Sequence, residues 1–322
     1  MLLADAVPAP TGPRGGYAKA RVFDDYLEHI LSFIDQRAIK PFSLVLDAGS
    51  GVGGLVAPAL FDRLPCRTTR LCFEVDGSFP NHEANPLIEE NRRDLVEAVQ
   101  AESADAGIAW DGDADRCFFV DGTGEFISGD FVTALLADAF LRKSPGATVL
   151  YDVRASHAVK NIVAAHGGRA LMNRVGHAFF KHRMREEDAV FGGEVTGHYY
   201  FRENFFADNG FIPALLILEL MSARGQTLRE LLAPLRARYF ISGEINTELD
   251  DQRLVAEKLD TLASRYADGH VYRMDGVSVE YPTWHFNVRP SNTEPLIRLN
   301  LEGGSQDEME TRRDEVLAVI RS

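Results

Sequence analysis

The 322-residue chain has little cysteine, no concentrated basic segment and no long apolar run. Its three cysteines (Cys66, Cys72 and Cys117) show no metal-ligand spacing and cannot all pair, so we expect a cytoplasmic protein. The formal charge is -14, from 34 basic and 48 acidic residues. It argues against nucleic acid or an anionic membrane as partner, because both need a concentrated basic surface. No apolar run approaches the roughly 20 residues that a membrane-spanning helix needs.

The composition that remains is typical of a globular protein, with 45% hydrophobic and 25% charged residues. Residues 1–16 are rich in Ala, Pro and Gly without a basic leader, and we predict a disordered tail rather than a secretory signal. Strands alternating with helices then predict two α/β domains, at 17–127 and 128–238. Residues 239–322 predict a smaller α+β domain with an antiparallel sheet. The two α/β domains share the same alternation of strands and helices, as an ancient duplication would leave it, but their sequences show no close repeat.

Within the first domain, the pattern predicts a strand over residues 70–75 and a helix over residues 85–102. It also contains a glycine-rich segment, LVLDAGSGVGG, at residues 44–54. Glycines after Asp47, and Glu74 at the end of the next strand, resemble a nucleotide-binding or methyltransferase loop. The other interpretation is a tight strand-to-helix turn without a ligand. We favour the turn, because the loops further along the chain have no role in a methyltransferase.

A more specific segment is WDGDADR, residues 110–116. Alternate positions of an extended segment point the same way, so Asp111, Asp113 and Asp115 can present oxygens to one hard cation. A helical-hand Ca²⁺ loop would need Gly at its sixth position and Glu at its twelfth, where this chain has Arg116 and Gly122. Mg²⁺ fits better, and it leaves coordination positions for a phosphate oxygen. A solvated, Asp-rich turn is the alternative.

A third segment, GGEVTGHYYF, covers residues 192–201. Glu194 stands between glycines at a predicted strand end, where a carboxylate can accept hydrogen bonds from adjacent sugar hydroxyls. Thr196 and His198 could add contacts. The alternative is a turn with a capping threonine.

The fourth segment, RPSNTEPLIR, covers residues 289–298 between two strands. Arg289 offers a guanidinium fork, and Ser291, Asn292 and Thr293 add two hydroxyls and an amide, which together can bind a phosphate dianion. Arg298 could reinforce the positive field, and a polar hairpin turn is the alternative. Taken together, the loops predict a phosphorylated sugar as ligand and phosphoryl transfer as the chemistry.

DGDADR, GEVTGH and RPSNTEP, in this order and spacing, resemble the α-D-phosphohexomutases, and most of all bacterial phosphomannomutase/phosphoglucomutase. VLDAGSGVGG and FPNHEANPL resemble the second domain of that family, which implies that the glycine loop is scaffold. The likeness runs from about Tyr17 to the C-terminus. It implies interconversion of hexose 6-phosphate and hexose 1-phosphate, of mannose or glucose, through a hexose 1,6-bisphosphate intermediate.

The resemblance also assigns roles to single residues. Asp111, Asp113 and Asp115 would hold Mg²⁺, and Arg116 would face a phosphoserine. Glu194, Thr196 and His198 would contact the sugar, whereas Arg289, Ser291, Asn292 and Thr293 would hold the non-reacting phosphate. His177, in VGHAFF, would assist proton transfer. The resemblance places Arg154 with Arg116 and His177 among the catalytic groups. Arg154 stands where relatives often carry lysine, and it cannot act as a base because arginine keeps its proton in proteins.

The family has four domains, and its first carries the phosphoserine in a loop like T-A-S-H-N-P, which we do not find in this chain. RASHAV (with Ser156) and GSFPNHEANP (with Ser78) imitate that loop but fit the patterns of their own domains. We therefore expect domains two to four without a nucleophile. We also expect weakened Mg²⁺ affinity and an exposed apolar patch where the first domain would dock. A separate chain is one source of that domain.

A non-catalytic sugar-phosphate binder is the main alternative function. The intact aspartates argue against it, because a pure binder does not need this metal.

Overall fold

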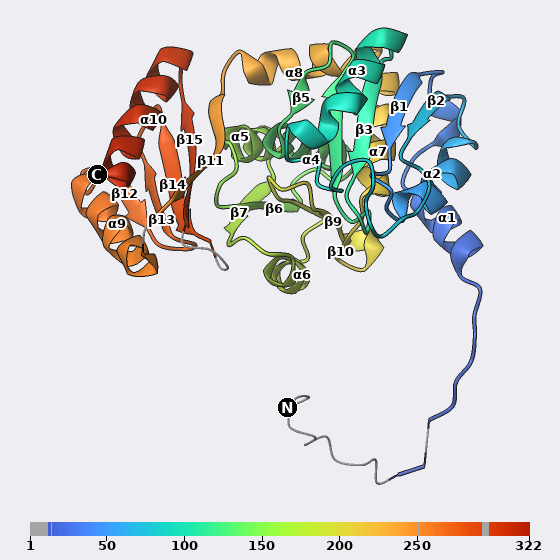
Figure 1. Ribbon diagram of the computed structural model, residues 1–322, viewed down its shortest axis with the longest axis horizontal. Coiled ribbons are helices and arrows are strands. Elements are labelled where there is room, and N and C mark those ends of the chain that lie inside the picture. Colours follow the sequence, from blue (N-terminus) through green and yellow to red (C-terminus); the bar gives the residue numbers. More distant parts are fainter. Residues whose placement is uncertain (1–11, 14, 250, 292–295) are drawn as a thin grey trace.

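The computed structural model describes residues 12–13, 15–249, 251–291 and 296–322, and these form three sheets of five strands each (Figure 1). In the first sheet the strand order is β2-β1-β3-β4-β5, with β2, β1 and β3 parallel and β4 and β5 antiparallel. The elements of this domain are α1 (Phe23–Leu31), β1 (Ser43–Asp47), α2 (Gly53–Phe61), β2 (Arg67–Leu71), α3 (Arg93–Glu102), β3 (Ala106–Trp110), β4 (Cys117–Asp121) and β5 (Phe126–Ile127).

The second sheet repeats the topology of the first. Read from the edge that corresponds to β2, its order is β7-β6-β8-β9-β10, again with three parallel strands followed by two antiparallel ones. Chain order and pairing correspond strand by strand, as an ancient duplication would leave them. The elements are α4 (Gly129–Lys143), β6 (Thr148–Asp152), α5 (His157–Ala165), β7 (Arg169–Asn173), α6 (His177–Glu186), β8 (Phe191–Gly193), β9 (Tyr199–Phe201), β10 (Ala207–Asp208), α7 (Phe211–Arg224) and α8 (Leu228–Arg236).

One apolar core is shared by these two α/β domains. The central parallel strands β1, β3 and β6 are buried along nearly their whole length, because helices cover both faces of such a sheet. Helix α7, with the sequence FIPALLILELMSAR, is buried along most of its length and contacts both α4 and β4. The indole N–H of Trp110 also donates a hydrogen bond to the carbonyl oxygen of Gly210 at 2.8 Å. The first two sheets therefore form one packed body.

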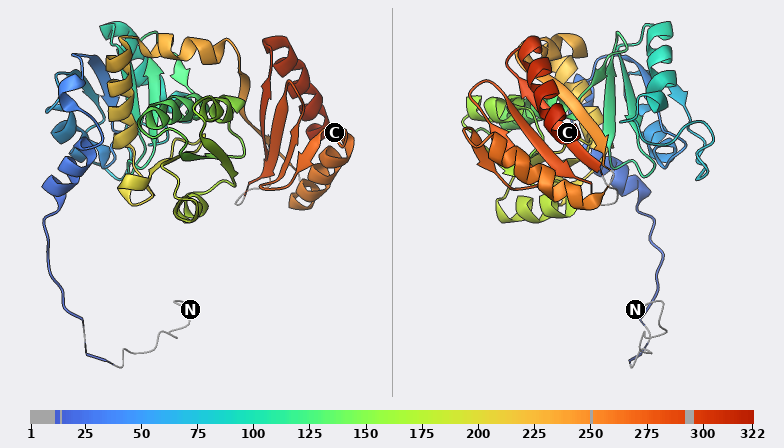
Figure 2. Two further views of the ribbon diagram at one scale, coloured as in Figure 1. Left: turned by 180° about the vertical axis from the view of Figure 1, so that it is seen from behind. Right: turned by 60° about the vertical axis from the view of Figure 1, so that its left-hand side comes forward.

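The C-terminal domain has an antiparallel sheet in the order β11-β15-β14-β13-β12 and an apolar core of its own. Figures 1 and 2 show its helices on the face of the sheet turned away from the other domains. Its elements are β11 (Phe240–Glu248), α9 (Gln252–Arg265), β12 (His270–Tyr272), β13 (Val277–Glu280), β14 (His285–Pro290), β15 (Leu296–Gly303) and α10 (Gln306–Arg321). The three domains confirm the expected fold class.

Two elements of the first domain differ from the sequence-based expectation. The second strand ends at Leu71, because Cys72 takes a left-handed backbone conformation with φ of 54°. The helix expected over residues 85–102 begins only at Arg93. The carbonyl groups of Pro86 and Leu87 accept hydrogen bonds from the side chain of Arg92 instead of helical N–H groups. In the described part of the chain, no helix combines the length and apolarity needed to cross a membrane.

Candidate active site

The glycine loop after β1 packs directly on the aspartate loop after β3. A Cβ atom at Gly51 would lie 2.4 Å from the carbonyl oxygen of Gly112, a distance that no real side chain tolerates. The N–H of Val52 donates to that same oxygen at 3.0 Å. Glycine is therefore required here for close contact between two backbones. This contact supports the scaffold interpretation of the glycine loop.

The three aspartates of the second loop converge. Their carboxylate oxygens lie within 4.8 Å of one another, although Asp111 is buried, Asp115 is half-buried and Asp113 is exposed. The Nε atom of Arg116 donates to Asp111 at 2.6 Å, and the backbone N–H of Arg116 donates to the other oxygen at 3.1 Å. Burial raises the pKa of Asp111 against the opposing effect of Arg116, and burial raises the pKa of Asp115 against that of His198. A further cation would stabilise the ionised form of both carboxylates.

The sugar loop, residues 194–198, lies between β8 and β9, just as the aspartate loop lies between β3 and β4. The two loops also touch. Arg116 and His198 form an antiparallel bridge, and the N–H of Cys117 donates to the carbonyl oxygen of Gly197 at 3.1 Å. The loops at equivalent positions of the two α/β domains thus contact each other.

His198 is held among acidic groups. Its Nδ1 atom lies 3.0 Å from Asp208 and 3.6 Å from Asp115, and Lys181 also pairs with Asp208 at 2.7 Å. Burial alone would lower the pKa of His198, but Asp208 and Asp115 outweigh burial and raise it. The ring of His177, an exposed residue at the start of α6, lies parallel to the His198 ring with centroids 6.0 Å apart. The structure therefore brings both predicted histidines to the sugar loop.

Glu194 is only 1% exposed, and both of its oxygens are engaged. One accepts the backbone N–H of Gly176 at 2.8 Å, and the other accepts the hydroxyl of Tyr200 at 2.5 Å. Each carboxylate oxygen retains accepting capacity for a ligand hydroxyl. Thr196, two residues further, is half-buried. The carboxylate is thus fixed in place before any ligand binds.

Arg154 connects the sugar loop to the C-terminal domain. Its side chain is 0% exposed and pairs with Asp152 at 2.7 Å and with Glu244 at 3.3 Å. Asp152 also accepts the N–H of Val195 at 2.9 Å. Asp152 raises the pKa of Arg154 against the effect of burial, so the guanidinium keeps its charge. In this arrangement Arg154 contacts protein carboxylates on both sides.

Three arginines meet at one carboxylate in the C-terminal domain. Besides Arg154, Glu244 contacts Arg289 at 3.3 Å and Arg298 at 3.1 Å. The Nε atoms of Arg289 and Arg298 are buried and lack a hydrogen-bond partner in the described part of the chain. Burial, reinforced by the charge of Arg154, lowers the pKa of Arg289. The cluster has an excess of positive charge and unused donors, which suits an anion.

The rest of the predicted phosphate loop is only partly described. Ser291 is buried, and its N–H donates to the carbonyl oxygen of Leu296 at 2.9 Å. Asn292 and Thr293 lie outside the described residues.

The two serines that imitate a phosphoserine loop have local structural roles. Ser156 is 1% exposed and caps α5, since its hydroxyl oxygen accepts the N–H of Ala158 at 3.0 Å. Ser78 is exposed, and its hydroxyl donates to Asp76 at 2.8 Å.

The sequence reasoning does not identify several partners of the site, among them Asp152, Tyr200, Asp208 and Glu244. Asp152 carried a usable signal, because it ends β6 as Asp47 ends the equivalent strand β1. Tyr200, Asp208 and Glu244 reach the site only through strand pairing and loop packing.

Three family models match the chain. The model described as phosphoglucomutase/phosphomannomutase, alpha/beta/alpha domain II, matches residues 24–124; domain III matches residues 128–239; and the C-terminal domain matches residues 244–319. The chain belongs to this phosphohexomutase family.

Named relatives point to the same class. Phosphohexose mutases from Xanthomonas campestris are 44% identical over 299 residues, which cover 92% of this chain and 66% of the relative. A Vibrio cholerae phosphomannomutase is 42% identical over 296 residues, 90% of this chain and 64% of the relative. The chain thus spans about two thirds of the length of the curated relatives it matches.

Solved structures agree. A phosphoglucomutase/phosphomannomutase family protein from Burkholderia thailandensis superposes with a TM-score of 0.83 at 32% identity, over 95% of this chain and 66% of that chain. An N-acetylphosphoglucosamine mutase from Aspergillus fumigatus, solved in complex with GlcNAc-6P and magnesium, shares the fold with a TM-score of 0.65 at 18% identity. The superposition covers 92% of this chain and 70% of the Aspergillus fumigatus chain.

Proposed function

We propose that this chain is the metal-binding, sugar-binding and phosphate-binding part of a phosphohexomutase, with residues 17–127, 128–238 and 239–322 as the three domains. The enzyme interconverts hexose 6-phosphate and hexose 1-phosphate, with mannose and glucose phosphates as substrates, and works in the cytoplasm. The main support is an unbroken series of contacts. It leads from the aspartate loop through the sugar loop and Arg154 to the arginines around Glu244.

Asp111, Asp113 and Asp115 fit Mg²⁺, because a set of carboxylate oxygens is the donor type that this hard cation prefers. When bound, the ion would neutralise the oxygens of the phosphoryl group being transferred. Arg116 lies beside the aspartates and adds a positive charge that is always present. The pair of Arg116 with Asp111 holds the guanidinium at the edge of the loop, where it can face a phosphate.

Glu194 is the main acceptor of hydrogen bonds from the sugar hydroxyls in this proposal. Because Gly176 and Tyr200 already fix its carboxylate, it loses little freedom when a hydroxyl donates to it. Thr196 and His198 contact the sugar from the same loop. His177, exposed and close to His198, is placed to move a proton on a sugar oxygen.

Arg289 and Ser291, with Asn292 and Thr293, hold the phosphate that does not react. The buried Nε atoms of Arg289 and Arg298 are the donors that this anion would satisfy. Arg154 keeps the clamp and the sugar loop at a fixed separation.

A hexose 1,6-bisphosphate is the intermediate in this proposal, and it turns round in the site between two transfers. The phosphoryl group comes from a phosphoserine in a domain or chain outside the described residues, because Ser156 and Ser78 serve local structure. Of the twelve exposed large apolar side chains among the described residues, six lie between residues 52 and 88, where such a domain could pack. They are Val52, Leu55, Val75, Phe79, Leu87 and Ile88.

The first test measures binding of mannose 1-phosphate to the purified chain by calorimetry, with Mg²⁺ present. We expect saturable binding that Arg289→Ala weakens at least tenfold. Arg273→Ala is the matched control, since Arg273 pairs with Asp260 on the exposed surface of the same domain. No saturable binding, or equal loss in both variants, would refute the proposed clamp.

The second test adds catalytic glucose 1,6-bisphosphate and follows mannose 6-phosphate together with the intact protein mass. No turnover and no added mass is the expected result for the chain alone, and turnover should appear once a phosphorylated first domain of a relative is supplied. Turnover with one added phosphate would instead identify a nucleophile within this chain. Binding without turnover even after complementation would favour the non-catalytic sugar-phosphate binder.

A further inference from the structure

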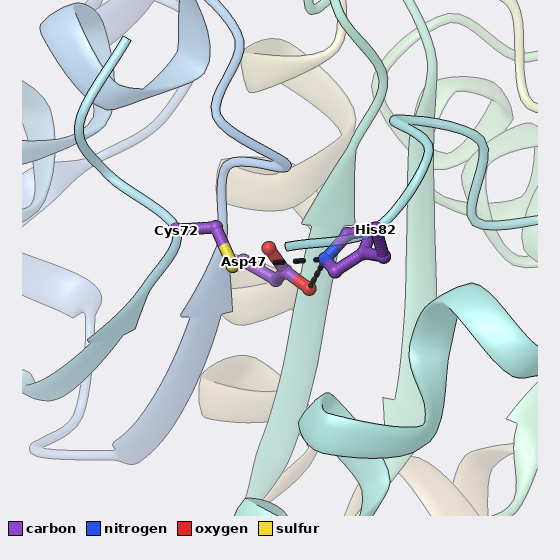
Figure 3. A group of neighbouring side chains, drawn as sticks. All are labelled: Asp47, Cys72 and His82. Atoms are coloured by element: carbon purple, nitrogen blue, oxygen red, sulfur yellow. Dashed lines mark hydrogen bonds and ion pairs between the residues drawn. The ribbon is translucent and has the colours of Figure 1, made fainter. Parts of the chain in front are cut away.

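Three side chains with metal-binding atoms meet at the carboxyl ends of β1 and β2, and the proposed phosphoryl transfer uses none of them. Asp47 ends β1, Cys72 directly follows β2, and His82 comes from the long loop before α3 (Figure 3). The Nε2 atom of His82 lies 3.1 Å from Asp47 and 3.7 Å from the sulfur of Cys72. The three ligand atoms all lie within 4.8 Å of one another.

The separations of these atoms suit a tetrahedral ion. With Zn–S bonds of about 2.3 Å and Zn–N or Zn–O bonds of about 2.0–2.1 Å, tetrahedral angles put sulfur and nitrogen about 3.5 Å apart. The same bonds put nitrogen and oxygen about 3.3 Å apart. The observed distances of 3.7 Å and 3.1 Å differ from these values by a few tenths of an ångström. The two separations from Nε2 are therefore close to those around a bound ion, and the third pair, the sulfur of Cys72 and the oxygen of Asp47, lies within 4.8 Å.

The orientation of His82 favours a metal site over a nucleophilic relay. In a relay, the thiol and the carboxylate contact opposite nitrogens of the imidazole. Here both Asp47 and Cys72 face Nε2, whereas Nδ1 lies 2.9 Å from the carbonyl oxygen of Glu83. A hydrogen bond from the far nitrogen to a carbonyl group is the usual support of a metal-binding histidine, because it leaves the other nitrogen free for the ion.

Burial and local contacts hold these residues in place. Asp47 is 2% exposed, the side chain of His82 is 11% exposed, and Cys72 is half-buried. The other oxygen of Asp47 accepts the N–H of Gly49 at 2.9 Å. Thiolate and imidazole donors favour borderline-soft cations over Mg²⁺.

We propose that Asp47, Cys72 and His82 form a second metal site, which binds Zn²⁺ or a cation of similar softness and is separate from the three aspartates. The chain supplies three ligands, and water completes the tetrahedron. The ion would join the ends of β1 and β2 to the loop between β2 and α3.

Cobalt absorption tests the site on the full chain after treatment with a chelator. Co²⁺ bound by a thiolate gives a near-ultraviolet charge-transfer band that carboxylate ligands do not give. We expect this band to saturate and to disappear on addition of Zn²⁺. Cys72→Ser should abolish it, and His82→Asn should weaken Co²⁺ binding at least tenfold. Cys66→Ser, at another half-buried cysteine, and Asp113→Asn, in the aspartate loop, should both retain the band.

Two results would overturn the proposal: no charge-transfer band in the folded wild-type chain, or an unchanged band in Cys72→Ser. Circular dichroism checks that each variant is folded. A second measurement needs no variant. Zn²⁺ should slow alkylation of Cys72 in the wild-type chain at least tenfold, as located by peptide mass, and an unchanged rate would also count against the site.

Discussion

Glu244 is expected to limit how tightly the arginine cluster binds phosphate. Its carboxylate contacts Arg154, Arg289 and Arg298 at distances from 3.1 to 3.3 Å. The three arginines lower the pKa of Glu244 against the effect of burial, so it is ionised at neutral pH. With Asp152, which pairs with Arg154, three positive and two negative charges leave the cluster at +1, and Glu244→Gln raises this to +2. A phosphate would then be attracted by a larger positive charge, and the Glu244 carboxylate would no longer compete with it for the arginines.

The size of the effect follows from Coulomb's law. A carboxylate and a phosphate about 6 Å apart repel by about 0.7 kcal/mol per unit of phosphate charge in water, and by about four times as much at an effective dielectric constant of about 20. The Glu244 side chain is 24% exposed, so the lower part of that range applies. For a phosphate that carries about two negative charges, we expect the binding free energy to become more favourable by about 1–2 kcal/mol, which is about five- to thirtyfold tighter binding.

The same substitution should destabilise the chain, because it removes the ion pairs of Arg289 and Arg298. Arg154 keeps Asp152 as a partner. The expected loss in free energy of unfolding is about 1–3 kcal/mol, below the range for fully buried pairs. Stability and phosphate affinity therefore move in opposite directions.

Calorimetric titration with inorganic phosphate and with mannose 1-phosphate at low ionic strength measures the first effect, and thermal denaturation measures the second. Glu248→Gln is the matched control, since Glu248 is exposed on the same strand and no ion pair is recorded for it among the described residues. An unchanged or weaker phosphate affinity in Glu244→Gln would refute the reasoning. It would show that Glu244 orients the arginines for phosphate instead of competing with it.

Further substitutions test the scaffold and the buried ionisable groups. Gly51→Ala brings a methyl group against Gly112; we expect a loss of about 1–3 kcal/mol in thermal denaturation and weaker Mg²⁺ binding in titration, whereas a wild-type melting curve would contradict the proposed loop packing. Burial raises the pKa of Glu302 from 4.5 to about 7, so its stabilising effect is complete below pH 4.5 and is lost as pH rises through 7. Glu302→Gln should therefore gain about 1–3 kcal/mol relative to wild type between pH 5 and pH 8 in urea unfolding, and equal pH profiles would exclude this. Asp208→Asn should lower the pKa of His198 in an NMR titration, because the carboxylate that raises it is removed; an unchanged pKa would contradict the assigned pairing.

The sequence predicts the fold class and the loops of the site, but it does not predict which residues contact those loops. Apolar runs such as SLVLD and AGIAW predict buried parallel strands. Asp111, Asp113 and Asp115 converge as expected, but residues 112–114 form a turn with Ala114 at φ of 57° and not the extended segment on which that prediction is based. Glu244 is different. A bulge shifts the pairing of β11 with β15 between Ile241 and Glu244, and a shift of one residue reverses the face to which a side chain points. Periodicity along one strand contains no information about such a shift.

The glycine loop and Arg154 show a second limit. Gly49, Gly51 and Gly53 fit both a cofactor loop and a close backbone contact, and only the position of Gly112 distinguishes the two. Arg154 was expected among the catalytic groups. One of its ion-pair partners is Glu244, which is 90 residues away in the chain. Contacts of that kind become visible only after the domains are assembled.

The shared core of the first two domains has a consequence for cooperativity. Neither sheet can lose its structure without exposing the helices between them, so the two should unfold in one transition. The C-terminal domain has a separate core, and its hydrogen bonds and ion pairs with that body include those of Arg154 and Glu244. It can therefore melt on its own. A ligand that contacts Glu194 at one end and Arg289 at the other would make both units melt together, so that calorimetry in the presence of ligand reports the assembly of the site.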